Sequence, residues 1–133
     1  MLGRIKLGDS YPVRTMAVIN LSRESFYNRS FVGLDEVLER AKALVKEGAD
    51  FLDLGAVSTA PGSPPISEKE ERRRLIPALT KILENLDVEV SVDTQRADIA
   101  DEALSFGASC INDVSCLRDQ KMADTIANHD RSL

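Results

Sequence analysis

Residues 88–111, VEVSVDTQRADIADEALSFGASCI, decide the fold. They hold two short runs that are apolar on both faces, 88–92 and 108–111, which is typical of buried parallel strands. A helical stretch near 98–106 lies between them, with these side chains expected to point inward: Ile99, Ala103 and Phe106. Gly107 follows it directly, where a helix C-cap is expected. The stretch therefore predicts one strand–helix–strand unit of a parallel α/β fold.

The same alternation extends toward the N-terminus and beyond the unit. Two further apolar runs, 15–19 and 51–54, predict strands, and a weaker helical pattern near 120–127 follows the last one. The helical faces between the strands are formed by Leu34, Val37, Leu38, Ala41, Leu44 and Val45, and by Leu75, Leu79, Ile82, Leu83 and Leu86 with Ile76 at the edge. Four successive βα units without a linker predict one domain over 1–133, with a parallel sheet.

Several residues mark where the helices begin and end. Ser67-Glu68-Lys69-Glu70 is a capping-box pattern, and Gly48 stands where the first helix should end. Pro77 lies inside the second helical pattern and predicts either a kink or a division into two helices.

Composition excludes some functions. The chain has 133 residues, is 43% hydrophobic and carries a net charge of −5, which argues against a dedicated nucleic-acid binder. No apolar run approaches the roughly 20 residues of a membrane helix, and residues 1–10 lack the apolar core of a signal peptide. Cys110 and Cys116 lack C-x-x-C or zinc-finger spacing, so we expect reduced thiols in a cytoplasmic protein. His129 suits a helix end better than a metal site.

Each predicted strand carries a polar residue at or near its end: Asn20, Asp53, Asp93 and Asn112. The carboxyl ends of parallel strands are where such folds bind ligands. Capping or turn roles explain any one of these residues, and we expect such roles for Thr94 and Asp113. The four together predict a rim that binds a polar small molecule, because carboxylates and carboxamides pair with the N–H and C=O groups of a heterocycle.

The loop 57–63 adds a second candidate feature. The hydroxyls of Ser58 and Thr59 stand beside Pro61 and Gly62, an arrangement that suits phosphate oxygens. Loops of Pro, Gly and Ser are common, however, so this pattern alone leaves a purely structural role open.

Four motifs in order resemble the signatures of the dihydropteroate synthase family. Residues 16–26 (MAVINLSRESF) are similar to M-G-I-L-N-V-T-P-D-S-F, and 48–62 (GADFLDLGAVSTAPG) to G-A-D-I-I-D-I-G-G-E-S-T-R-P-G. Residues 91–94 (SVDT) match S-V-D-T, and 107–114 (GASCINDV) match G-A-x-x-I-N-D-I. The resemblance covers nearly the whole chain and implies the first half of a TIM (β/α)8 barrel.

The resemblance also implies roles for seven residues. Asn20 corresponds to the residue that helps hold the Mg²⁺–pyrophosphate of the pterin substrate, and Ser58 and Thr59 lie in the pyrophosphate loop. Asp93 and Asn112 correspond to the residues that bind the pterin ring. Ser25 and Phe26 lie in the first loop, which closes over the arylamine. The implied reaction joins hydroxymethyl-dihydropterin pyrophosphate to p-aminobenzoate, and Mg²⁺ accompanies the pyrophosphate. The resemblance leaves the catalytic residues unknown.

The chain departs from the family pattern at several positions. The arginine after Thr59 is replaced by Ala60, and the Pro-Asp of the first loop by Arg23 and Glu24. The residues of the motifs resemble those of the archaeal branch of the family. That resemblance implies a ribosylated arylamine as the acceptor, in the synthesis of tetrahydromethanopterin.

A (β/α)8 barrel takes about 250 residues, so four units form half of one. The family's further pterin aspartate and lysine, and its final arginine, would lie beyond 133. The open edges of such a sheet motivate an expectation of self-association, as a homo-oligomer that closes the barrel. Two alternatives stay open: a methyltetrahydropterin–corrinoid methyltransferase-type pterin domain, and a non-catalytic fragment.

Overall fold

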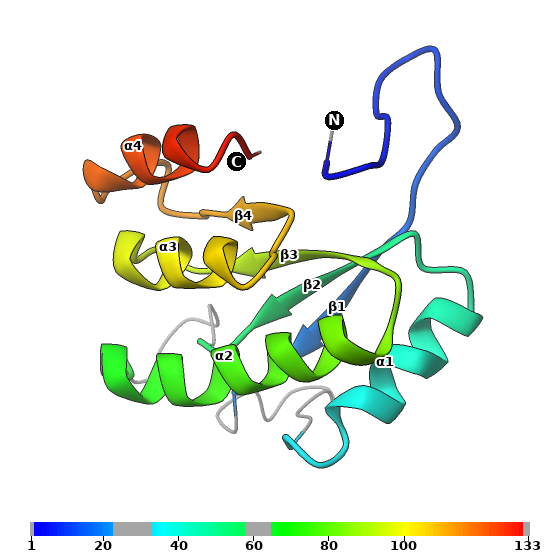
Figure 1. Ribbon diagram of the computed structural model, residues 1–133, viewed down its shortest axis with the longest axis horizontal. Helices are drawn as coiled ribbons and strands as arrows, with labels where there is room; N and C mark the ends of the chain where they lie inside the picture. Colours follow the sequence, from blue (N-terminus) through cyan, green and yellow to red (C-terminus); the bar gives the residue numbers. More distant parts are fainter. Residues whose placement is uncertain (1, 23–32, 58–64, 132–133) are drawn as a thin grey trace.

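The computed structural model describes residues 2–22, 33–57 and 65–131 (Figure 1). In chain order, the elements are β1 (Met16–Asn20), α1 (Val37–Lys46), β2 (Phe51–Gly55), α2 (Glu68–Asn85), β3 (Glu89–Asp93), α3 (Ala97–Ser105), β4 (Cys110–Asn112) and α4 (Lys121–Asn128). The four predicted βα units are confirmed, with strand bounds that differ by one or two residues from those expected.

The strands form one parallel sheet in the order β1-β2-β3-β4. Each helix follows its strand, and the helices cover one side of the sheet (Figure 1). This arrangement is a partial (β/α) barrel. Strands β1 and β4 are its two edges among the described residues, and the expected self-association through them stays a prediction.

The core lies between the sheet and the helices. Its fully buried strand residues include Leu52, Leu54, Val90, Val92 and Ile111, which meet inward side chains of α1, α2 and α3. The opposite side of the sheet is less covered. The expectation of strands buried on both faces is wrong for β1, where Val18 is 59% exposed, because β1 is an edge strand with no helix on that side.

Two predicted inward side chains point elsewhere. Phe106 is 51% exposed because α3 ends at Ser105, and Ala97, Ala100 and Leu104 complete its buried stripe instead. Leu34 is 46% exposed because α1 begins only at Val37.

The predicted helix ends are confirmed. Ser67 Oγ accepts a hydrogen bond from the Glu70 amide at 3.2 Å, which caps α2. Gly48 and Gly107 have φ of +107° and +110° and end α1 and α3, a conformation that favours glycine. Helix α2 continues through Pro77, so a division into two helices is wrong. Pro77 lies on the exposed side, where water can satisfy the carbonyl that loses its partner.

Both cysteines are free thiols, Cys110 buried and Cys116 exposed. His129 is the C-cap of α4 and its ring lies 2.8 Å from Asp101 of the preceding helix, as expected for a helix-end role. Among the described residues, no helix is long and apolar enough to span a membrane.

Cys116 offers a stability test, because it follows β4 with φ of +57°. Side chains with a Cβ are strained in this left-handed region, and glycine is not. We expect Cys116→Gly to raise the free energy of unfolding by about 0.5–1 kcal/mol in urea titrations. The exposed Ser105→Gly, at the last residue of α3, is the matched control and should lower it slightly, because glycine has a poor helix propensity.

Candidate functional site

On the face of the sheet that lies away from the helices, side chains of neighbouring strands stand in layers, because alternate residues of each strand point to this face. In the register of the sheet, Asn20 pairs with Gly55, Gly55 with Asp93, and Asp93 with Asn112. These four positions form the layer at the carboxyl ends of the strands. The structure therefore brings together three of the predicted site residues, Asn20, Asp93 and Asn112, on one rim.

Asp53 lies one layer deeper than the sequence analysis placed it. It pairs in register with Val18 and Ser91, because it stands two residues before Gly55 on a strand with a period of two. Its Oδ2 accepts a hydrogen bond from the Asn112 side-chain amide at 3.2 Å. Its Oδ1 is buried without a partner among the described residues. Asp53 thus lies under the rim and orients the Asn112 carboxamide.

Gly55 keeps the middle of the rim open. A Cβ at this position would lie 3.5 Å from the Cβ of Asp93 and 3.6 Å from its Oδ2. A methyl group would therefore be in van der Waals contact with Asp93, and a larger side chain would fill the space between Asn20 and Asp93. Glycine at the carboxyl end of β2 leaves that space for a ligand.

The Asp93 carboxyl has a pKa raised to about 6. Burial contributes most, because it disfavours the charged form, and the neighbouring carboxylates of Asp53, Glu71 and Asp113 add repulsion. A carboxyl group with a perturbed pKa beside a cavity is a common property of ligand sites. Near neutral pH, Asp93 is mostly ionised and can accept hydrogen bonds from N–H groups.

Asn20 is tied into a local turn. Its Oδ1 accepts hydrogen bonds from the backbone amide and the hydroxyl of Ser22, at 2.9 and 2.7 Å. Mg²⁺ binds oxygen ligands, usually carboxylates and substrate phosphates. Both of these contacts engage the same oxygen, and the role of Asn20 toward a Mg²⁺–pyrophosphate stays a prediction. The described residues contain no cluster of three His, Cys, Asp or Glu that could hold a metal ion.

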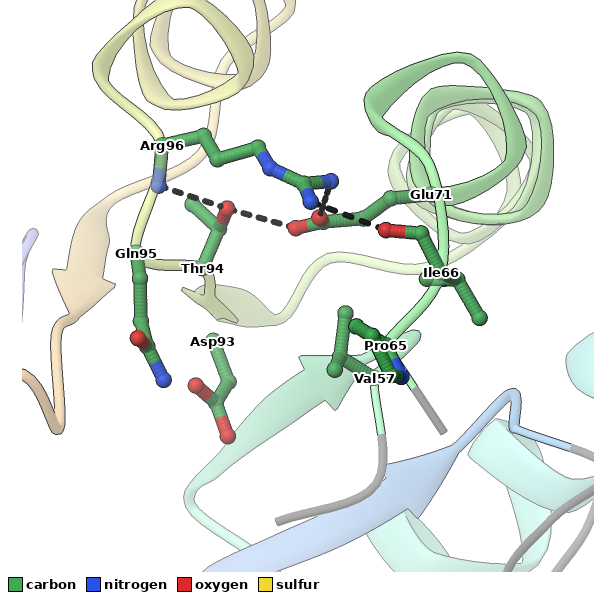
Figure 2. Close-up of a pocket in the computed structure, with 8 residues that line it drawn as sticks. All are labelled: Val57, Pro65, Ile66, Glu71, Asp93, Thr94, Gln95 and Arg96. Atoms are coloured by element: carbon green, nitrogen blue, oxygen red, sulfur yellow. Dashed lines mark hydrogen bonds and ion pairs between the residues drawn. The ribbon is translucent and has the colours of Figure 1, made fainter. Parts of the chain in front are cut away.

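A cavity of about 190 Å³ opens beside the rim (Figure 2). Figure 2 shows Asp93 and Gln95 pointing into it, with Val57 and Pro65 on the opposite side. One wall is therefore polar and the other apolar, which suits a flat, polar ring. Gln95 was not among the predicted site residues, and its place directly after the S-V-D-T motif is the only sequence signal for it.

A network of polar side chains forms the wall of this cavity on the side of α2. Glu71 is only 2% exposed, and its carboxylate accepts hydrogen bonds from the Thr94 hydroxyl at 2.6 Å and from Arg96 Nη1 at 2.5 Å. Arg96 Nη2 donates to the Ile66 carbonyl at 2.9 Å. Sequence analysis missed this network because its members are 23 to 30 residues apart.

The two expected turn residues have structural roles. Thr94 Oγ1 accepts from the Arg96 amide at 3.3 Å, and the Asp113 carboxylate accepts from the amides of Ser115 and Leu117 at 2.8 and 2.9 Å. These bonds also keep the pKa of Asp113 below its ordinary value, against the opposing effect of burial. The remaining predicted site residues, Ser25, Phe26, Ser58 and Thr59, lie outside the described residues.

These features define a class: a parallel α/β half-barrel whose strand ends place carboxylate and carboxamide groups on one rim. The family model described as pterin binding enzyme matches residues 16–133, and the chain belongs to this family.

Known proteins agree with this assignment. Dihydropteroate synthase of Bacillus subtilis is 41% identical over 124 residues, which is 90% of this chain and 44% of the synthase. Two solved structures match with similar extent. The Thermus thermophilus synthase in complex with 4-aminobenzoate is 45% identical with a TM-score of 0.76, over 90% of this chain and 41% of that one. The Anaplasma phagocytophilum synthase with bound 6-hydroxymethylpterin-monophosphate is 34% identical with a TM-score of 0.77, over 89% and 44%.

The chain therefore spans less than half the length of the relatives it matches. The solved synthases are TIM barrels, which confirms the expected fold class of a partial barrel.

Proposed function

We propose that this chain is the pterin-binding half of a dihydropteroate synthase-type transferase. The reaction condenses a hydroxymethyl-dihydropterin pyrophosphate with an arylamine in folate synthesis. The observation that carries the proposal is the rim on which Asp93 and Asn112 stand side by side in register, with Asp53 bonded to Asn112 beneath them. Relatives of the same family, one with a bound pterin monophosphate and one with 4-aminobenzoate, support it.

The rim suits the donors and acceptors of a pterin. The Asp93 carboxylate accepts hydrogen bonds from the ring's amino and N–H groups. The Asn112 carboxamide, fixed by Asp53, presents its oxygen as an acceptor, because its NH₂ group is directed at the carboxylate below. The space above Gly55 admits the edge of the ring. Binding and orienting the pterin is thus the contribution of the described residues.

The proposed chemistry is a substitution at the pterin methylene carbon. The bond from this carbon to the pyrophosphate oxygen breaks, and pyrophosphate leaves with the electron pair. The arylamine nitrogen forms the new C–N bond and then loses a proton to solvent. The electron-rich ring stabilises the cationic carbon, and holding both reactants in place lowers the entropic part of the barrier.

Magnesium enters this proposal with the substrate, as a complex of the pyrophosphate. Phosphate oxygens and water are the ligands that Mg²⁺ prefers, so a protein-held site is not required for it to accompany the leaving group. The loop residues Ser58 and Thr59, with Ser25 and Phe26 in the first loop, are proposed to contact the pyrophosphate and the arylamine.

The acceptor is proposed to be p-aminobenzoate or a ribosylated derivative. The latter follows from the archaeal resemblance, and the route to tetrahydromethanopterin stays a prediction with it. We place the activity in the cytoplasm, which the free thiols support. The methyltransferase alternative is not favoured by a particular observation, since the similar proteins named above are all dihydropteroate synthases.

Calorimetry tests the proposal. We expect saturable binding of hydroxymethyl-dihydropterin pyrophosphate with Mg²⁺ to the wild-type chain. Asp93→Ala should weaken it by at least about 10- to 100-fold, because a charge-assisted hydrogen bond contributes about 1.5–3 kcal/mol. The exposed Asp124→Ala, on α4, is the matched control and should bind like wild type. Binding that survives in Asp93→Ala would contradict the assignment of the site.

A further inference from the structure

Arg96 connects three segments around the cavity. It stands at the N-cap of α3, just after β3. Its guanidinium donates to Glu71 in the first turn of α2 and to the carbonyl of Ile66, which closely precedes that helix. Figure 2 shows its side chain extending toward Glu71 in the wall of the cavity that both residues line, whereas Asp93 points into the cavity. Arg96 therefore belongs to the wall of the cavity, where its guanidinium is engaged by Glu71 and by the carbonyl of Ile66.

The same network is connected through Thr94 to two residues of the rim, Asp93 and Asn112. The hydroxyl of Thr94 donates to Glu71, and its backbone amide donates to the carbonyl of Asn112 at 3.2 Å. Asp93 precedes Thr94 in the chain. The start of α2 is thus fixed to the end of β3, and the end of β3 to the end of β4.

The network also affects how much negative charge surrounds Asp93. Three carboxylates act on Asp93 from the elements packed around it: Asp53 of β2, Glu71 of α2 and Asp113 after β4. Arg96 makes an ion pair with one of them, Glu71, which is almost fully buried. A buried carboxylate without a partner is strongly unfavourable, so this pairing decides how much negative charge Asp93 meets.

We propose that Arg96 is a positioning residue for the pterin site, which clamps the entry to α2 against the end of β3 and neutralises the buried Glu71 beside Asp93. The inference rests on the proposed function, since it concerns how the pterin-binding carboxylate is held. The clamp itself is formed entirely by the protein's own residues.

The test compares Arg96→Met with Arg96→Lys. Methionine keeps much of the length and removes the charge, whereas lysine keeps the charge but not the planar pair of donors. Carbon-13 NMR titration follows the carboxyl group of Asp93, and amide hydrogen exchange follows residues 66–71. The exposed Arg40→Met, on α1, is the matched control.

In Arg96→Met we expect the Asp93 carboxyl to titrate about one pH unit higher, because the cation that compensates the negative charge around it is gone. Amide exchange at residues 66–71 should be about 10-fold faster, and pterin pyrophosphate should bind about 10-fold more weakly. In Arg96→Lys the titration should return to the wild-type range while exchange stays fast. This split separates the charge of Arg96 from its clamp, and a general loss of packing would not produce it.

Unchanged titration and unchanged exchange in Arg96→Met would overturn the inference. If Arg96→Met does not fold, Glu71→Gln is measured instead, because its neutral amide weakens the clamp without leaving an uncompensated carboxylate. Amide exchange at residues 66–71 of Glu71→Gln that matches wild type would then overturn the inference. Failure of wild-type protein to bind pterin pyrophosphate would count against the proposed function alone, because titration and exchange need no ligand.

Discussion

Asp93→Asn is expected to raise the free energy of unfolding at pH 7.5 by about 2 kcal/mol while it abolishes pterin binding. The gain arises because ionised Asp93 is partly buried beside Asp53, Glu71 and Asp113, and the neutral amide of nearly equal shape meets no repulsion there. The shift of its pKa from 3.8 to about 6 corresponds to about 3 kcal/mol at roughly 1.4 kcal/mol per unit. Solvent screening of a partly exposed group lowers that figure.

The pH dependence gives this expectation a definite sign. Between pH 3.8 and about 6 the native state binds more protons at Asp93 than the unfolded chain does, because burial raises the pKa of this carboxyl. The contribution of Asp93 to stability therefore falls as pH rises through that window, and the full penalty is present above it. The amide that replaces the carboxyl in Asp93→Asn cannot titrate, so the variant lacks this slope and should match wild type near pH 3.

Urea unfolding of both proteins from pH 3 to 8 measures the difference. The exposed Asp124→Asn, on α4, is the matched control and should follow wild type within about 0.5 kcal/mol. Stability curves for Asp93→Asn and wild type that stay parallel across the window would show that the Asp93 carboxyl is not perturbed. A gain in stability that accompanies a loss of binding is the usual mark of a residue held in place for a ligand.

Local patterns in the sequence sufficed for much of the fold. The short apolar runs located the four strands, and Gly48 and Gly107 located two helix ends, because each depends only on residues close in the chain. The rim residues Asn20, Asp93 and Asn112 followed from the rule that parallel strands present ligand residues at their carboxyl ends.

Other features depend on packing between distant segments. Asp53 was expected at the rim because β2 was predicted to end at Leu54. The strand ends one residue later, at Gly55, which occupies the rim position. Phe106 was expected inward because the helical period was carried past the point where α3 ends. The Glu71–Arg96 pair joins different βα units, and charged residues on a helix normally indicate a solvated face. Only the fold brings that pair together.

The side of the sheet that faces the helices should carry most of the stability. Leu54 of β2 is fully buried, between Ile19 and Val92 of the neighbouring strands. Leu54→Ala is expected to lower the free energy of unfolding by about 2–5 kcal/mol, because it removes buried methyl groups and leaves a cavity. That loss is a large part of the roughly 5–15 kcal/mol that stabilises a typical domain.

Leu34→Ala is the matched control for Leu54→Ala, since it makes the same chemical change at a position that the sequence pattern also placed inward. Because the structure exposes Leu34, the control should lower stability by only about 0.5 kcal/mol in the same urea titrations. Similar losses in the two variants would mean that the segment before α1 packs on the core. A large difference would show that the α1 segment packs on the core only from Val37 onward, and that the strand which ends at Gly55 is anchored from the helix side. The open side of the sheet, which includes Gly55, Asp93 and Asn112, would then remain free to serve the ligand.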